Sequence, residues 1–376
     1  MMRNTTSLLW LFCLLIASWV PAQDLTYVFT DLGHADDLSS EATAINNQGV
    51  VVGSISYNSS GTPRQRAFWY SDGVRRFDFD GGSAPNMKSS ALAVNDTGCA
   101  VGWTQATDGA PIHLAGFKAA DSCPFDHSIN LTSLGGLQTS ALGINNADLV
   151  VGYSETGAGE YHAFSMTLGT TSMTDLGVLP DGWGSAAFDI NEEGASVGYS
   201  SSSTVVQTAT RWDSGIPVDL GAFPGAPAGT ESYAYAINDL ASPQIVGWSY
   251  GSSSGGQQHA CIWQDGTMVD LPTLSGGTMS EANGVNDLGH VVGWARAADF
   301  HVYAVMWDDG QIIDLNTVDG IPAGWTLADA RAINNSGQIV GRGVFGGVDR
   351  AFLLTPIVFG DGFEDGTLDG WDSVFP

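Results

Sequence analysis

Three acidic residues share one position of a repeating motif and are the first candidates for chemistry in this chain. Glu41, Glu281 and Asp329 each directly precede the alanine of an Ala-x-x-Ile/Val-Asn motif. They would therefore occupy the same point of three repeats, which are neighbours if the repeats close into a ring. Converging carboxylates could bind Ca²⁺ or act as an acid and a base on a sugar. The alternative is that they are solvated acids in a very acidic chain.

Two tryptophans are the next candidates, because exposed indole rings can stack on sugar faces or anchor a protein partner. Trp183 lies between two glycines, and Trp325 follows a glycine at a similar place in another repeat. Both fall in connections between repeats. The alternative for both side chains is packing over the neighbouring repeat.

No strong catalytic motif accompanies these residues. A Gly-x-Ser-x-Gly string at Gly251–Gly255 lies in a serine- and glycine-rich loop, without the strand–turn–helix context of a nucleophile. His162 and His259 share one repeat column, which favours packing on a strand over metal binding. The sequence lacks the spacings of zinc sites, phosphate-binding loops and dinucleotide-binding turns. We therefore assign no catalytic residues, keep Ca²⁺ as the one candidate cofactor, and favour a protein that is not an enzyme.

The sequence motif that contains the candidate residues repeats with a period near 48 residues. The motif asparagine occurs seven times, at spacings of 49, 50, 46, 47, 48 and 48 residues. The seven are Asn46, Asn95, Asn145, Asn191, Asn238, Asn286 and Asn334. A regular period of this length indicates one repeat architecture that uses most of the chain.

Each repeat has the pattern of four short strands separated by turns rich in Asn, Asp and Gly. In the first repeat the expected strands are Glu41–Asn46, Val50–Ile55, Arg66–Tyr70 and Val74–Phe79. Seven such repeats predict an all-β fold, a seven-bladed β-propeller of four-stranded blades over residues 24–356.

The two ends of the repeat array predict how the ring closes. The seventh repeat ends at Pro356 without a fourth strand, whereas Tyr27–Gly33 has the pattern of one. We expect this N-terminal strand to complete the last blade. An open stack of repeats is the alternative, but it leaves the divided repeat unexplained. A closed ring would carry its longer, variable loops on one face, where we expect any binding site near the central opening.

The same residues resemble the HAF-repeat family of extracellular bacterial proteins. That family is named for a His-Ala-Phe tripeptide, which is followed by Trp-x-x-Gly and Asp-Leu-Gly. The full tripeptide occurs here at His162–Phe164, with variants at Arg66–Phe68, His259–Cys261 and Arg350–Phe352. The resemblance spans about residues 25–356. It implies an extracellular location and a repeat fold, and it transfers no activity.

The chain ends and the composition point to secretion. Residues 1–22 have a positive charge, an apolar run and a small-residue end, as in a cleaved signal peptide, and residues 357–376 form an acidic tail. The formal net charge of −28 argues against nucleic-acid binding, and no segment after the signal is a candidate membrane span. Cys99 and Cys123 fall in one repeat and could form a local disulfide, whereas Cys261 occupies a core position as a free thiol.

Together these features predict a secreted, non-enzymatic recognition or scaffold module for a glycan or another surface protein. One alternative is a polysaccharide hydrolase or lyase that uses carboxylates near the central channel. Another is a structural component of a surface or matrix. The sequence does not identify the ligand, the oligomeric state or the role of the tail.

Overall fold

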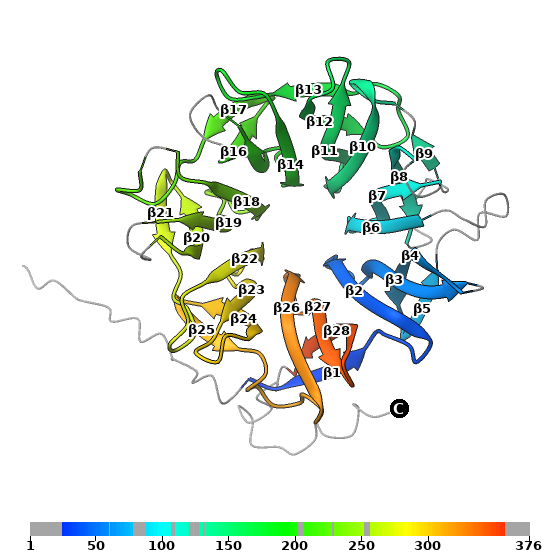
Figure 1. Ribbon diagram of the computed structural model, residues 1–376, viewed down its shortest axis with the longest axis vertical. Coiled ribbons are helices and arrows are strands. Elements are labelled where there is room, and N and C mark those ends of the chain that lie inside the picture. Colours follow the sequence, from blue (N-terminus) through cyan, green and yellow to red (C-terminus); the bar gives the residue numbers. More distant parts are fainter. Residues whose placement is uncertain are drawn as a thin grey trace, which may run out of the picture.

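The computed structural model describes residues 25–59, 61–77, 88–106, 110–119, 123, 128–130, 132–201, 207–227, 229–251 and 256–357. The predicted signal peptide and the predicted tail beyond Ile357 lie outside these residues. The described strands form seven four-stranded antiparallel sheets arranged around a central axis (Figure 1). The fold is a seven-bladed β-propeller, which confirms the prediction.

The innermost strand of each blade lies beside the central axis, and the other three strands lie successively farther out. Blade 1 contains β2 Asp37–Ile45, β3 Val51–Ser59, β4 Thr62–Ser71 and β5 Val74–Phe77. Blade 2 contains β6 Lys88–Val94, β7 Cys99–Gln105, β8 Ile112–Lys118 and β9 Ser128–Asn130. Blade 3 contains β10 Gly135–Ile144, β11 Leu149–Thr156, β12 Tyr161–Thr167 and β13 Thr174–Gly177. Blade 4 contains β14 Ser185–Ile190, β15 Ser196–Ser200, β16 Thr208–Asp213 and β17 Ile216–Asp219.

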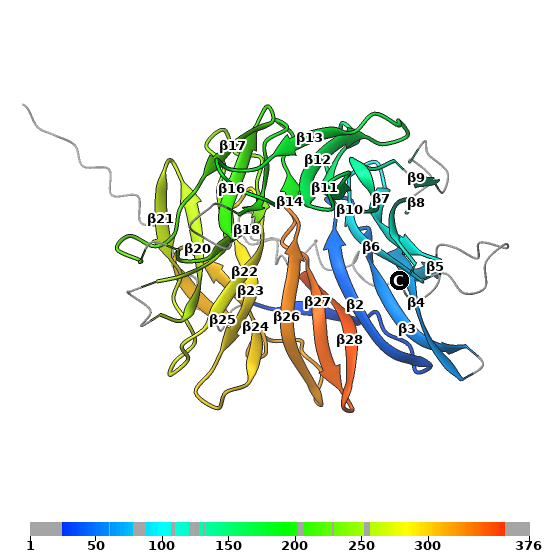
Figure 2. The same ribbon diagram turned by 45° about the horizontal axis from the view of Figure 1, so that its top comes forward.

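The remaining three blades follow the same plan and stand side by side around the axis (Figure 2). Blade 5 contains β18 Ser232–Ile237, β19 Ile245–Tyr250, β20 Gln258–Gln264 and β21 Thr267–Asp270. Blade 6 contains β22 Ser280–Val285, β23 Val291–Arg296, β24 Val302–Asp308 and β25 Gln311–Asp314. Blade 7 contains β26 Trp325–Ile333, β27 Ile339–Phe345, β28 Val348–Pro356 and, as its outer strand, β1 Tyr27–Asp31.

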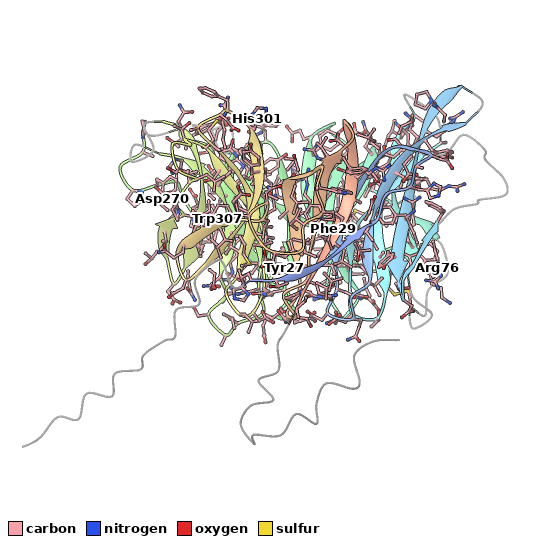
Figure 3. All side chains as sticks on the ribbon, turned by 90° about the horizontal axis from the view of Figure 1, so that it is seen from below. Tyr27, Phe29, Arg76, Asp270, His301 and Trp307 are labelled. Carbon is pink, nitrogen blue, oxygen red and sulfur yellow. A yellow bond between two sulfur atoms is a disulfide. The ribbon has the colours of Figure 1, made fainter. Side chains whose placement is uncertain are left out.

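The N-terminal strand closes the ring as expected. β1 pairs antiparallel with β28, from Tyr27 opposite Pro356 to Asp31 opposite Phe352. Tyr27 is buried, and Figure 3 shows it together with Phe29 along β1. Arg350 donates a hydrogen bond to Asp31 across the same pair of strands. Two ends of the chain therefore share one blade.

A β-bulge at the same place in every inner strand explains two columns of the motif. The register shifts directly after the motif alanine, as between Ala42 and Ala44 in blade 1. That alanine faces the glycine of the second strand, as Ala42 faces Gly53. A Cβ at Gly53 would lie 2.1 Å from the carbonyl oxygen of Glu41, and the corresponding glycines of the other blades meet a carbonyl in the same way. The bulge therefore requires glycine at this position.

A ring of hydrogen bonds joins the seven motif asparagines. Each side-chain amide donates to the backbone carbonyl of the corresponding asparagine in the next blade, and Asn334 donates to Asn46 to close the circle. The next residue adds a second ring, in which its backbone N–H donates to a side-chain oxygen of the next blade. The motif asparagine thus fixes both its own turn and the neighbouring blade.

Asn145→Ala is expected to lower the free energy of unfolding by about 2–4 kcal/mol. The substitution removes the bond to Asn191 and leaves the backbone N–H of Leu149 without its acceptor, and both groups are buried or partly buried. Urea unfolding of the full chain measures the change. Asn146→Ala is the matched control, because its side chain belongs to the exposed second ring; an equal loss in the two variants would contradict this account.

The first residue of two HAF-type tripeptides contacts an aspartate of the neighbouring strand. His162 and His259 on third strands pair with Asp175 and Asp270 on fourth strands, each at 2.9 Å. This is the strand packing that the sequence favoured. A disulfide joins Cys99 to Cys123, and Cys261 is a buried free thiol, as expected.

Candidate functional site

The bulges place one unpaired residue per blade on the innermost strands. It follows the motif alanine and has no cross-strand partner in the sheet register, since Ala42 and Ala44 pair with consecutive residues. Its side chain can reach the next blade: Thr43 donates to the carbonyl of Ala91, and Asn283 donates to that of Ala330. Bulges commonly redirect side chains in this way. In blades 4 to 7 the residues are chemically diverse, namely Phe188, Tyr235, Asn283 and Arg331.

Asp329 lies at the centre of the predicted acidic cluster. Its side chain is buried and accepts a hydrogen bond of 2.8 Å from the amide of Asn283. It also forms an ion pair of 2.9 Å with Arg331. Burial nevertheless raises the pKa of Asp329, and the charge of Glu41 raises it further against the opposing effect of the arginine. Asp329 is therefore held by its neighbours and is electrostatically coupled to Glu41.

Glu281 lies on the other side of Asp329. The amide of Gln258 donates to its carboxylate at 2.5 Å. Burial raises the pKa of Glu281, and the charge of Asp329 adds to the effect. Glu41 accepts a bond of 3.3 Å from the hydroxyl of Ser54. The structure thus brings all three acids to adjoining inner strands, β2, β22 and β26, and within electrostatic range of one another (Figure 1).

An arc of aromatic side chains continues from the acids through blades 5 and 4. Tyr233 stacks on Trp248 with ring centroids 4.8 Å apart, and it contacts Tyr199 of the next blade at 5.2 Å. Phe188 and Tyr235 meet at 5.3 Å across the same blade boundary. These five side chains are called the aromatic arc below. Their rings contact one another continuously across the boundary between blades 4 and 5; Trp248 is buried and the other four side chains are partly buried.

The aromatic arc and the acids meet at Tyr235. Its hydroxyl accepts a hydrogen bond of 3.2 Å from the indole of Trp248. Burial raises the pKa of Tyr235, and the second largest cause is the charge of Glu281. The aromatic arc, the carboxylates of Glu41, Glu281 and Asp329, the amide of Asn283 and the guanidinium of Arg331 are therefore neighbours on the inner strands. Together they are called the inner wall. Such a wall can offer both apolar contact and hydrogen bonds to one ligand.

The two predicted tryptophans lie in different environments. Trp183 is 55% exposed, and its loop is held by the hydroxyl of Ser201, which accepts from the backbone N–H of Trp183. Trp325 is the first residue of β26 and packs between Phe29 at 4.7 Å and Phe345 at 5.4 Å. Only Trp183 presents an open indole, and Trp325 packs over blade 7.

The sequence interpretation missed the second-strand residues that share this wall. They follow the glycine of each second strand and lie opposite the residue before the motif alanine, which is an acid in blades 1, 6 and 7. The column is Ser54, Trp103, Tyr153, Tyr199, Trp248, Trp294 and Arg342. The recurrence of large aromatic residues directly after this glycine was the available signal. It could have been found by aligning the seven repeats.

A second polar region lies at the asparagine turns. A hollow of about 160 Å³ there is lined by residues of all seven blades, including Asp96, Asp189 and Glu192. Asp189 is partly buried and accepts bonds from the backbone N–H groups of Ile190 and Ile237, at 2.8 and 2.9 Å. Burial raises the pKa of Asp189 to about 6. The corresponding residue of every other blade is alanine or glycine.

Neither region has the arrangement of a metal site. Among the described residues, no group of three His, Cys, Asp or Glu side chains could hold a metal ion. Ca²⁺ therefore stays a prediction from the sequence. In the described part of the chain, no helix is long and apolar enough to cross a membrane.

Solved structures share the fold at low sequence identity. A prolyl endopeptidase matches with a TM-score of 0.53 and 10% identity, over 90% of this chain and 52% of that chain. A mutant of AofleA from Arthrobotrys oligospora gives 0.43 and 12%, over 79% of this chain and 94% of that one. Aleuria aurantia lectin, a six-bladed β-propeller that recognises fucose, gives 0.37 and 12%, over 80% and 98%. No family model and no curated protein matches the sequence. The similarity to the prolyl endopeptidase concerns the fold alone.

Proposed function

We propose that this protein is a secreted recognition module that binds a glycan at the inner wall formed by the aromatic arc and by Glu41, Glu281 and Asp329. The observation that carries the proposal is the junction of Tyr235 and Trp248 with Glu281. A sugar presents C–H faces that stack on aromatic rings and hydroxyls that bond to carboxylates and amides. The wall supplies both kinds of contact in adjoining blades.

The charge of the wall favours a neutral glycan. Three carboxylates stand beside one another there, and Arg331 is already paired with Asp329. The whole chain carries a formal net charge of −28. An anionic polysaccharide would meet repulsion from the wall and from the rest of the surface. The extracellular location and the membership of the HAF-repeat family stay part of this proposal.

Glu281→Gln is expected to weaken glycan binding about tenfold and to leave the fold intact. The change removes a charged acceptor, and hydrogen bonds to charged groups contribute about 1.5–3 kcal/mol. Titration calorimetry of the full chain with neutral oligosaccharides measures the affinity. Asp270→Asn is the matched control, because Asp270 lies at the outer edge of the ring (Figure 3). Equal affinities of wild type and Glu281→Gln, or no binding by the wild type, would contradict the proposal.

A glycan hydrolase is the second candidate, and the raised pKa of Glu281 favours it. A carboxylic acid whose pKa is raised by burial can serve as the general acid in glycoside hydrolysis. Release of new reducing ends from a bound oligosaccharide would establish this activity, and Glu281→Gln would abolish it. Binding without product release supports the recognition module.

A further inference from the structure

A hollow of about 390 Å³ lies between blades 4 and 5, away from the inner wall. It is lined by residues of the two outer strands of blade 4 and the connection that follows them, and by residues of β20, β21 and the start of β19 in blade 5. Leu220, Ile245 and Met268 supply an apolar lining, together with the indole of Trp263. Arg211 and Gln264 supply polar groups. Its volume is in the range of small-molecule sites, about 300–1,000 Å³.

The buried indole of Trp263 has an unused hydrogen-bond donor. Trp263 is 4% exposed, and its Nε1–H has no partner among the described residues. The equivalent Trp307 in blade 6, labelled in Figure 3, donates from Nε1 to the carbonyl of Pro272 at 2.8 Å. An unpaired buried donor costs about 1–3 kcal/mol. Because the Nε1 atom is enclosed, a ligand in the hollow gains that energy when the indole or its neighbours shift to admit an acceptor. Trp212 also leaves its Nε1 unpaired, so the indole defines a site only together with the hollow.

The neighbouring groove between blades 5 and 6 provides an internal comparison. It lies at the corresponding place one blade further along the chain and has a volume of about 320 Å³. Its lining contains Ile262 at the position that Arg211 occupies in the hollow between blades 4 and 5. Arg211 donates from Nε to Asp213 at 2.7 Å, so the arginine enters the hollow as a neutral pair. Asp219 and Asp265 add negative charge to the lining. The hollow between blades 4 and 5 therefore differs from its neighbour by the Arg211–Asp213 pair, and its remaining acids disfavour an anionic ligand.

We propose that this hollow binds one residue of a neutral pyranose sugar. The apolar lining suits the C–H face of the ring, whereas the indole N–H, Arg211 and Gln264 suit its hydroxyls. The site is separate from the inner wall and goes beyond the function proposed for that wall. Its ligand is a single sugar residue, whereas the wall would bind an extended glycan.

Ligand-observed NMR of the full chain with a panel of neutral methyl glycosides tests the proposal. We expect at least one glycoside to bind in the millimolar range, as suits a ligand of this size. Trp263→Phe keeps an aromatic ring and removes the donor, so it should weaken binding about tenfold. Arg211→Ile, which copies the neighbouring groove, should also weaken binding and keeps the core intact.

Trp307→Phe is the matched control, because its indole N–H is already bonded to Pro272. This variant should bind the glycoside like the wild type. Absence of binding, or binding that neither Trp263→Phe nor Arg211→Ile changes, would overturn the proposal. Glycoside binding that only Glu281→Gln weakens would place the sugar at the inner wall; it would overturn this site and support the function proposed above.

Discussion

Deletion of residues 24–33 is expected to unfold the protein. The deletion removes β1 and the residues beside it, including the buried side chains of Tyr27 and Leu32, and exposes the edge of β28. Each side chain contributes about 1.5–3 kcal/mol by burial, and each strand hydrogen bond adds about 1 kcal/mol. The sum is comparable to the total stability of a typical protein, about 5–15 kcal/mol. Circular dichroism during heating and urea unfolding measure the loss.

A circular permutant separates the loss of β1 from the loss of chain connectivity. The backbone N–H of Ile357 donates to the carbonyl of Thr26, so the end of β28 and the start of β1 already lie side by side. A short linker from residue 357 to a copy of residues 25–33 should therefore restore the blade as a continuous hairpin. We expect the permutant to fold with near wild-type stability. A deletion variant that melts like the wild type would show that β1 does not close the ring.

Asp189→Ala is expected to remove a large pH dependence of stability. The folded pKa of Asp189 is about 6, above the ordinary value for an aspartate of about 3.9. The folded state therefore binds this proton more tightly than the unfolded state does. Its contribution to stability is fully present below the unfolded pKa and is lost as the pH rises through the folded pKa. The loss is about 3 kcal/mol between about pH 4 and pH 7.

The variant should cross the wild type in stability as the pH rises. At low pH it should be the less stable protein, because the backbone N–H groups of Ile190 and Ile237 lose their acceptor. Toward neutral pH its free energy of unfolding should gain about 3 kcal/mol relative to the wild type. Urea unfolding across this pH interval measures both curves. Glu160→Ala, at an exposed acid of blade 3, should follow the wild type; a parallel curve for Asp189→Ala would refute the assignment.

Several elements of the fold could be predicted because they repeat. The asparagine turns, the Val-Val-Gly strands and the divided seventh repeat each follow from local turn and strand preferences. The structure confirms the blade number and the N-terminal closure. The start of the first inner strand differs, as β2 begins at Asp37 rather than at Glu41, and the expected end of the fourth strand at Phe79 lies outside the described residues. Strand ends depend on contacts with neighbouring strands, which a repeat pattern does not record.

The sites were only partly predictable, because their contacts cross blade boundaries. The sequence indicated that Glu41, Glu281 and Asp329 share a column on neighbouring blades. It did not indicate that Arg331 pairs with Asp329. Nor did it distinguish the exposed Trp183 from the packed Trp325. These outcomes depend on the rotation of each bulged strand and on the size of its neighbours.

The sequence alone determined the architecture of this protein, because a period near 48 residues with regular turn residues permits few other folds. It did not explain the glycine of each second strand, which the bulge beside the motif alanine requires. The tertiary structure alone decided which side chains meet on the inner wall, and why Trp263 keeps a free donor while Trp307 does not. The physical reason is that each of these features depends on packing between residues far apart in the chain. Their relative positions are fixed only when all seven blades close into a ring.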